Sequence, residues 1–244
     1  MKYITLFEQQ TAFDNAKSTL DKPNMSLVTE TGNVYSLAVG GGGNANGHPY
    51  VDLGLPSGLK WATMNVGASS ETDYGYYFQW GDTVDKSNAD CSWSTYKHCN
   101  GNEFLLKKYC TISDYGTVDS KTTLDPEDDA ARVIMGGDWR MPTKADFYEL
   151  LDNTDSEWMP NYNSTGVNGR RFTSTINGKS IFIPASGRRS GSSFVYRGDY
   201  GSIWSSSLYD DSFPMSAWDL NIGSDNSGAI GNDRYNGFAV RGVL

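Results

Sequence analysis

Three residue types, lysine, glutamate and glutamine, are missing from the last 65 residues of this chain. They occur 21 times in residues 1–179 and never in residues 180–244, where the same density would give about eight. Charge itself is not excluded, because Asp210 and Arg234 lie in this stretch. One explanation is a segment of loops and strands, which is depleted in glutamate and lysine. The other concerns the gene: all codons for the missing residues end in A or G, so codons with a fixed final pyrimidine never encode them.

The sequence also lacks long apolar runs and an excess of basic residues. No window approaches the ~20 apolar residues of a membrane-spanning helix, so we expect no membrane insertion. The formal charge of −9 and the pI near 4.7 argue against nucleic acid as a partner, because phosphate binding requires clustered lysine and arginine. The opening MKYITLFEQQTAFDNAK turns polar too early for a signal peptide, and we expect none.

Cysteine and histidine are too few to indicate a metal site or a catalytic base. Cys91, Cys99 and Cys110 form no C-x-x-C pair, which fits neither a disulfide framework nor a zinc site. We expect loop or buried thiols and leave open whether Cys99 and Cys110 pair. The two histidines, His48 and His98, lie in loop-rich sequence, and we expect both to be solvated.

Other catalytic arrangements are missing as well. Ser205-Ser206-Ser207 is not a G-x-S-x-G nucleophile elbow, and no glycine-rich phosphate loop is followed by lysine. Asp210 and Asp211 would point to opposite faces of a strand, unlike the paired carboxylates of a glycosidase. The sequence therefore predicts no enzyme, no catalytic residue and no cofactor. A hydrolase that uses aspartates is the least favoured alternative.

What the chain does contain is glycine and aromatic residues in short segments. Its 27 Gly, 15 Tyr and 7 Trp favour many short strands and turns, and residues 70–120 are expected to pack around their own aromatics. Asn177-Gly178 predicts a hairpin turn between strands near 171–175 and 179–184. With two predicted helices, the fold class is α+β.

Residues 1–47 read as a separate element for attachment or oligomerisation. Apolar residues at helical spacing from Phe7 to Leu20 predict a short helix, which Pro23 ends. Thr31-Gly32-Asn33 between two apolar runs predicts a hairpin, and Gly40–Gly43 a flexible joint. A helix and one hairpin cannot form a stable core alone. The main domain is expected to span 48–244.

Two helices are predicted in the main domain. Asp125 caps the first, which begins with Pro126 and runs to about Met135. Calcium binding by this acidic run is less favoured, because capping accounts for the carboxylates and EF-hand spacing is missing; we expect no metal. Thr143 caps the second helix with Asp146 as its capping-box partner, and Phe147, Leu150 and Leu151 face inward.

The segment between these helices reads GGDWRMPT. Here Trp139 and Met141 are expected to be buried, and Arg140 to pair with a carboxylate.

The C-terminal stretch 201–244 combines apolar frame residues with runs of Tyr, Asp, Asn, Ser, Gly and Phe. Trp204, Trp218 and Val243 belong to the frame. Rigid aromatics beside small polar residues are typical of antibody-like binding surfaces. The residues predicted to form a ligand-binding surface are Tyr196, Asp199, Tyr200, Tyr209, Asp210, Asp211, Phe213, Asp219, Asn221, Asn232, Asp233, Tyr235 and Asn236.

Eight blocks in order resemble one family, the FISUMP-type major paralogous domain of gut bacteria and their phages. The blocks are YVDLGLPSGLKWATMNVGA, DYGYYFQWGDT, LDPEDDAA, GGDWRMPTKADFYELL, FIPASGRRSG, IWSSSLY, AW and GFAVRGVL. This resemblance covers 50–244 and implies a C-type lectin-like fold, with two helices, small sheets and long irregular loops.

The tail from about residue 190 resembles the variable proteins of diversity-generating retroelements. In these proteins, adenine mutagenesis of asparagine codons yields no Lys, Glu, Gln, Met or Trp, so the resemblance implies that Met215, Trp204 and Trp218 are frame. The EPN, QPD and WND triplets of calcium-dependent lectins are missing, as is the cysteine pair of formylglycine-generating enzymes.

The resemblance implies a receptor-binding protein that displays a diversified surface for adhesion, on a phage virion or an extracellular surface. Its ligand would be a protein or glycan on a bacterial surface, and the chain would form a homotrimer or attach to a larger particle. The alternative is a carbohydrate-binding or structural module of fixed specificity in a surface assembly.

Overall fold

The computed structural model describes residues 25–28, 34–37 and 42–244, and the chain divides into two units, Met1–Gly42 and Gly43–Leu244. In the first unit, β1 (Met25–Val28) and β2 (Val34–Leu37) pair antiparallel, with Met25 opposite Leu37. This confirms the predicted hairpin. The predicted helix from Phe7 to Leu20, and the turn between the two strands, lie outside the described residues.

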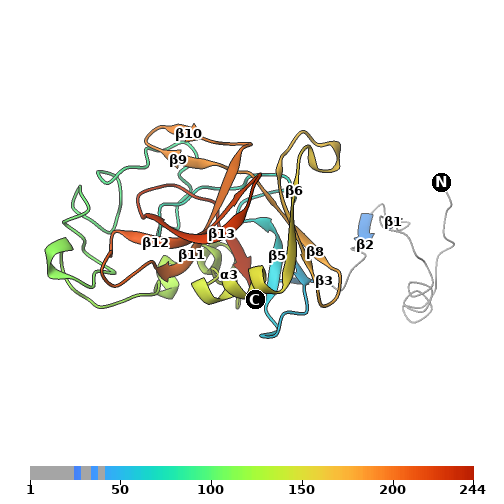
Figure 1. Cartoon of the computed structure of the whole chain (residues 1–244), viewed down its shortest axis with the longest axis horizontal. Helices are drawn as coiled ribbons and strands as arrows, with labels where there is room; N and C mark the ends of the chain where they lie inside the picture. Colours follow the sequence, from blue (N-terminus) through green and yellow to red (C-terminus); the bar gives the residue numbers. More distant parts are fainter. Residues whose placement is uncertain (1–24, 29–33, 38–41) are drawn as a thin grey trace. The chain divides into compact units, whose positions relative to one another are not determined.

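Small sheets and short helices make up the second unit (Figure 1). One sheet has the order β14 (Arg241–Val243), β5 (Lys60–Asn65), β4 (His48–Asp52) and β3 (Gly42–Ala45). A second contains β6 (Thr154–Met159), β7 (Gly169–Ser174) and β8 (Ser180–Pro184). The third contains β11 (Tyr200–Leu208), β12 (Ser216–Gly223) and β13 (Ser227–Asp233). β9 (Arg188–Ser190) and β10 (Ser193–Val195) form a hairpin.

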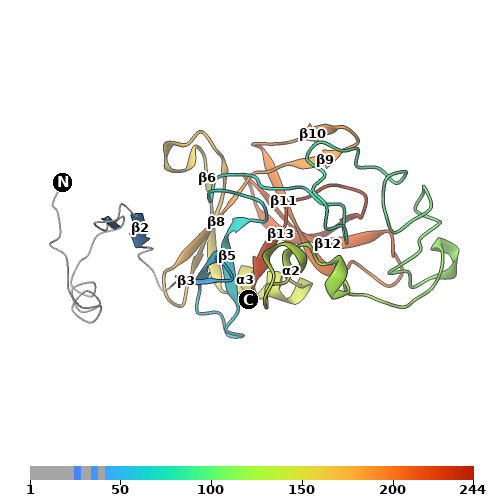
Figure 2. The same cartoon turned by 180° about the vertical axis from the view of Figure 1, so that it is seen from behind.

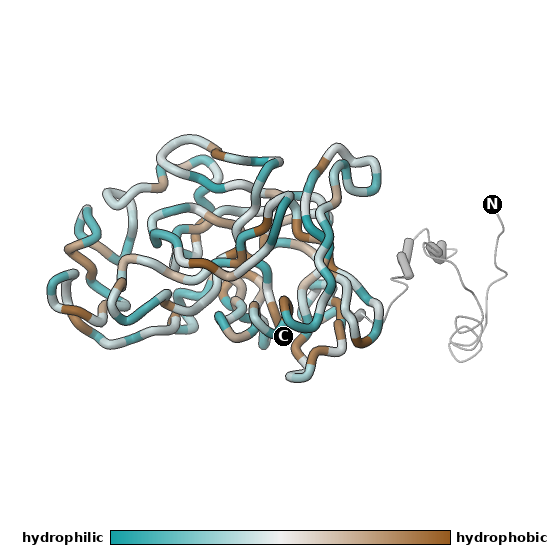
Figure 3. The backbone as a smooth tube through the Cα atoms, viewed as in Figure 1, coloured by the Kyte–Doolittle hydropathy of each residue, from teal (hydrophilic) through white to brown (hydrophobic). Residues whose placement is uncertain are grey.

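The strands pair antiparallel and occur beside two α-helices, so the fold belongs to the mixed α+β class, as predicted. Asn177-Gly178 lies in the turn between β7 and β8, which confirms that hairpin. Figure 3 shows polar and apolar residues mixed along the tube without a long apolar run. In the described part of the chain, no helix is long and apolar enough to cross a membrane.

The helix predicted from Asp125 is divided in two. Pro126–Asp128 form a 3₁₀ turn (η2), and the α-helix α2 spans Ala130–Met135. Asp125 occupies the N-cap position of η2 with Pro126 next, as predicted, but its side chain makes no capping hydrogen bond. Asp129 caps α2: its carboxylate accepts from the amides of Arg132 and Met141, at 2.9 and 2.8 Å. The last carboxylate of the acidic run thus ties α2 to the segment before the next helix.

The second predicted helix is confirmed as α3 (Lys144–Asp152). Thr143 and Asp146 form the full capping box, and Phe147 and Leu150 are buried. Arg140 Nη1 lies 2.6 Å from Asp146 Oδ2, which is the predicted ion pair. Trp139 and Met141 are buried, as predicted.

α3 packs against one face of the β11–β13 sheet. Ile203 of β11 and Leu220 of β12 share a core cluster with Phe147 and Leu150 of α3. The predicted frame residue Trp204 is also buried and stacks on Phe238 at 4.2 Å between ring centroids. The chain then returns to the first sheet, where Val243 of β14 lies opposite Trp61 of β5.

Residues 70–120 form loops with the short 3₁₀ turn η1 (Ser113–Tyr115). The later, green part of this segment lies at the end of the second unit away from β6 and β8 (Figure 2). Another 3₁₀ turn, η3 (Tyr162–Ser164), lies outside this segment. These loops pack around Tyr96 and Leu106 with Cys99 and Cys110, which confirms the predicted aromatic packing.

All three cysteines are free and buried, so Cys99 and Cys110 do not pair. The prediction that His98 is solvated is also wrong. Its ring is buried between Tyr96 and Tyr109, and burial lowers its pKa to about 4. The other histidine, His48, is half-buried beside Trp139.

Candidate ligand-binding site

Strand register places a set of polar residues on the face of the β11–β13 sheet that α3 does not cover. Ser202 lies opposite Asn221, and Asp219 lies opposite both Trp204 and Ile230. Residues directly opposite each other in antiparallel strands project to the same face, and alternate residues along a strand share a face. Tyr200, Ser202, Asp219, Asn221, Ile230 and Asn232 therefore belong to one face.

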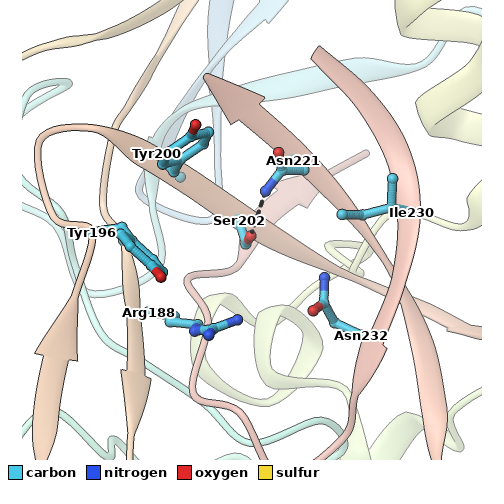
Figure 4. Close-up of a pocket in the computed structure, with 9 residues that line it drawn as sticks. Arg188, Tyr196, Tyr200, Ser202, Asn221, Ile230 and Asn232 are labelled. Atoms are coloured by element: carbon cyan, nitrogen blue, oxygen red, sulfur yellow. Dashed lines mark hydrogen bonds between the residues drawn. The ribbon is translucent and has the colours of Figure 1, made fainter. Parts of the chain in front are cut away.

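This face forms the floor of a pocket with a volume of about 370 Å³, called here the C-terminal pocket (Figure 4). Its size falls at the lower end of the range for small-molecule sites. The residues that line it are Gly187, Arg188, Tyr196, Tyr200, Gly201, Ser202, Asn221, Ile230 and Asn232.

One wall of the pocket comes from the β9–β10 hairpin and the turn after it. Gly187, just before β9, has φ +62°, and a Cβ there would meet the carbonyl oxygen of Val195 at 2.4 Å. Glycine thus allows the two chain segments to approach closely. Tyr196 follows the hairpin, with its ring 5.9 Å from that of Tyr200 and under the guanidinium of Arg188 at 5.6 Å.

The polar groups of the floor are held by hydrogen bonds. Asn221 Nδ2 donates to Ser202 Oγ at 3.3 Å, and Asn232 Nδ2 donates to Asp219 Oδ1 at 2.7 Å. Figure 4 shows Arg188 and Asn232 at one end of the pocket, with Tyr200 and Asn221 at the other. The pocket therefore combines two aromatic rings, two amides, one hydroxyl and one guanidinium, which is a set that can bind a polar ligand.

Asp219 belongs to the same face of the sheet but is completely buried and does not line the pocket. Burial raises the pKa of its carboxyl group to about 7, against the lowering effect of the Asn232 amide, the Ser202 hydroxyl and the positive charge of Arg188. Its Oδ2 has no hydrogen-bond partner in the described residues. A protonated carboxyl would bury this atom at lower cost than a carboxylate.

Four of the predicted binding residues meet in the C-terminal pocket: Tyr196, Tyr200, Asn221 and Asn232. Two others do not reach the surface. Asp219 is completely buried, and Asn236 is only 4 % exposed because the chain turns inward after β13. The prediction that these two residues lie on the surface is wrong.

The other predicted residues lie outside the pocket. Asp199 is exposed in the turn before β11. Tyr209, Asp210, Asp211 and Phe213 are exposed at the other end of β11, roughly 25 Å along the strand from Tyr200. Tyr209 packs on Trp218, 4.6 Å between ring centroids, and over Gly231, which belong to the opposite face of the sheet. Asp233 and Tyr235 are half-buried, and the ring of Tyr235 packs against Trp93.

Sequence reasoning did not select Arg188, Ser202 or Ile230 as binding residues. Ile230 and Ser202 alternate with Asn232 and Tyr200 along their strands, so the period of two would have found both. Arg188 comes from a separate hairpin, and its approach depends on the turn at Gly187. No local pattern in the sequence marks it.

Outside the pocket, Asp125, Glu127 and Asp128 form an acidic cluster whose carboxylate oxygens lie within 4.8 Å of one another. Lys108 Nζ lies 2.7 Å from Asp125 and 2.6 Å from Asp128, and Lys97 Nζ is 2.8 Å from Asp128. These ammonium groups already neutralise the carboxylates, and they lower the pKa of Asp128 well below its usual range. The cluster is therefore explained as an ion-pair network.

Comparisons of the chain with protein-family models, with curated proteins and with solved structures gave no significant match.

Proposed function

We propose that this chain is a ligand-binding protein whose C-terminal pocket and surrounding surface hold the recognition residues. One observation carries the proposal. Tyr196, Tyr200, Asn221 and Asn232, chosen from the residue types of the tail alone, converge on one pocket from three strands and the turn after β10. Tyrosine offers contact area at low entropy cost and asparagine offers directed hydrogen bonds, as in binding surfaces generally.

We extend the proposal to the fold of the second unit and to the place where the protein acts. Two short helices beside small sheets and long loops are compatible with a C-type lectin-like fold, which the sequence blocks suggest. The resemblance to retroelement variable proteins supports a diversified surface from about residue 190, used for adhesion by a phage particle or at a cell surface. The ligand is then a protein or glycan on a bacterial surface, and the first 47 residues attach or oligomerise the chain.

A binding role rather than catalysis is supported by the site's chemistry. No carboxyl group is among the residues that line the pocket, and the neighbouring Asp219 is buried; Asp210 and Asp211 lie in the turn between β11 and β12. Glycoside hydrolysis requires two carboxyl groups facing one bond. The buried His98 is held neutral above a pKa of about 4, in a loop core away from the pocket lining.

A carbohydrate-binding module of fixed specificity is the alternative, and the hydrogen-bonded floor favours it. Ser202 and Asp219 are buried and engage Asn221 and Asn232. Substitution of either asparagine would leave a buried polar group without its partner, at a cost of about 1–3 kcal/mol. A diversified surface must tolerate that cost, whereas a fixed site would retain both residues.

Binding of the whole chain to an array of bacterial surface glycans, and to intact bacterial cells, tests the proposed function. We expect Tyr200→Ala to weaken binding about tenfold or more, because truncating an anchoring aromatic commonly costs 2 kcal/mol or more. Tyr148→Ala is the matched control, since Tyr148 is similarly exposed, 41 % against 47 %, but lies on α3 outside the pocket. Equal binding by the wild type and Tyr200→Ala would contradict the proposal.

A further inference from the structure

The C-terminal pocket contains one cation with unused hydrogen-bonding capacity. Arg188 lines the pocket, and its Nε is buried without a hydrogen-bond partner. Among the residues that the structure describes, none forms an ion pair with it. Its guanidinium is placed over the Tyr196 ring, which holds the planar group in a defined orientation.

The charges around Arg188 limit what it can bind. Asp219 and Asp233 are the two carboxyl groups on which it acts electrostatically. Burial raises the pKa of both carboxyl groups, to about 7 for Asp219, which reduces the negative charge that Asp219 presents to an incoming anion near neutral pH. A single guanidinium matches one carboxylate with two parallel hydrogen bonds. A phosphate carries up to two charges, and only this one cation lines the pocket to meet them.

The remaining lining indicates the rest of the ligand. Asn221 and Asn232 offer amide groups, and Ser202 a hydroxyl, on the floor beside Arg188. Amides both donate and accept hydrogen bonds, which suits the hydroxyl groups of a sugar. Tyr196 and Tyr200 supply aromatic surface for the ring of such a ligand. The volume of about 370 Å³ favours a single residue of a saccharide over an extended peptide.

We propose that the C-terminal pocket selects a carboxylated sugar residue, of the uronic acid type, whose carboxylate is bound by Arg188. This inference rests on the proposed function and specifies its ligand class. The protein carries a net charge of −9, and Arg188 is the basic residue among those that line this pocket. Its guanidinium thus supplies positive charge to an acidic ligand within an acidic protein.

Calorimetric titration of the full chain with D-galacturonic acid and with its methyl ester tests this inference. The two sugars differ at one group, which is a charged carboxylate in the acid and a neutral ester with one additional methyl in the other. We expect the acid to bind about tenfold or more tightly, because a charge-assisted hydrogen bond contributes roughly 1.5–3 kcal/mol. Equal affinity for acid and ester, or no detectable binding of either, overturns the inference.

Substitutions at two arginines assign the preference to a residue. Arg188→Gln should abolish the preference for the acid while binding of the methyl ester stays within about twofold. Arg171→Gln is the control, because Arg171 pairs with Glu157 on β6 and β7 away from the pocket lining, and it should change nothing. An acid preference that persists in Arg188→Gln shows that another group binds the carboxylate, and the inference is then wrong.

Further outcomes separate this inference from the proposed function. If neutral glycans bind and Tyr200→Ala abolishes their binding, the pocket is a ligand site but not one for acidic sugars. If N-acetyl-glutamate binds through Arg188 while galacturonic acid does not, the pocket recognises carboxylates of peptides, and the sugar class is wrong. If Tyr200→Ala leaves binding of every ligand unchanged, the proposed function fails as well.

Discussion

At the scale of single residues, the buried carboxyl group of Asp219 sets an expected dependence of stability on pH. Its pKa is about 7 in the folded protein and near 3.8 in the unfolded chain. Between these values the folded state binds the additional proton, so the free energy of unfolding falls as pH rises and is lowest above about 7. Asp219 therefore favours the folded state most in acid.

Asp219→Asn should remove this contribution. An asparagine at position 219 keeps an oxygen that can accept from Asn232 but does not titrate. We expect the melting temperature of the wild type to fall more between pH 5 and pH 8 than that of the variant. Other titrating groups are shared by both proteins, so the comparison isolates this carboxyl. Parallel pH profiles in differential scanning calorimetry would show that Asp219 titrates normally.

Arg234 is the second residue for which the structure makes a sharp prediction. It is completely buried, donates to Tyr96 Oη and to the carbonyl oxygens of Lys108, Tyr109 and Pro214, and lies 4.8 Å from the centre of the Trp80 ring. Arg234 thus joins the end of β13 to the loops of 70–120. Lysine has neither the planar fork nor enough donors in the right directions.

Arg234→Lys should destabilise the protein on the order of 3 kcal/mol or more, because several hydrogen bonds to a buried charge are lost at once. Chemical denaturation measures this change. Arg171→Lys serves as the control, since its partner Glu157 is exposed and a surface ion pair contributes roughly 0–1 kcal/mol. Similar small losses in both variants would contradict the structural role assigned to Arg234.

Residue-scale expectations from the sequence succeeded where the evidence was local. The capping box at Thr143 was predictable because both partners lie within four residues. Burial of Asp219 and Asn236 was not, since it depends on strands and turns from distant parts of the chain. The approach of Arg188 to the tail was missed for the same reason.

At the scale of elements, the β11–β13 sheet has two different faces. One packs on α3 through Ile203 and Leu220, and the other presents Tyr200, Asn221 and Asn232 to the pocket. The period of two in these strands is legible in the sequence, but which strands pair is not. The divided helix at 126–135 also escaped prediction, because Asp125 and Asp129 are both acceptable caps and only tertiary contacts with Met141 decide between them.

Thr143→Ala tests the N-terminal cap of α3, the helix that packs on this sheet. The change removes the hydroxyl that accepts from the Asp146 amide, and loss of such a cap costs about 1 kcal/mol. For a chain of this size we expect the melting temperature to fall by roughly 2–4 °C. Thr117→Ala, at an exposed threonine, should leave it unchanged. An unaltered melting temperature in Thr143→Ala would mean that the cap adds nothing to stability.

At the scale of the whole molecule, the interior of the second unit contains three free cysteine thiols. Cys91, Cys99 and Cys110 are free and buried, and burial raises the pKa of Cys91 to about 11. Buried thiols of raised pKa react slowly, because the thiolate is the reactive form.

A thiol reagent such as Ellman's reagent should therefore label the native protein slowly and all three cysteines after unfolding in denaturant. Reducing agent should leave the melting temperature unchanged, since no disulfide among these residues contributes to stability. Fewer than three reactive thiols in freshly unfolded, unreduced protein would reveal a disulfide and contradict the structure.

The proposed diversified surface makes the C-terminal tail the most informative part of the molecule. Its missing lysine, glutamate and glutamine have two explanations, a codon constraint or a loop- and strand-rich composition. The fold separates positions that can vary from positions that cannot. Tyr196 and Tyr200 line the pocket and are more than 45 % exposed, whereas Trp204 and Leu220 are completely buried.

Deep sequencing of the locus in related isolates, together with its flanking DNA, tests the central claim most directly. We predict that codons for Tyr196, Tyr200, Asn221 and Asn232 differ between isolates while those for Trp204 and Leu220 do not. A near-repeat of the tail and a reverse-transcriptase gene should lie nearby. An invariant tail without such a repeat would contradict the diversified surface and favour a binding module of fixed specificity.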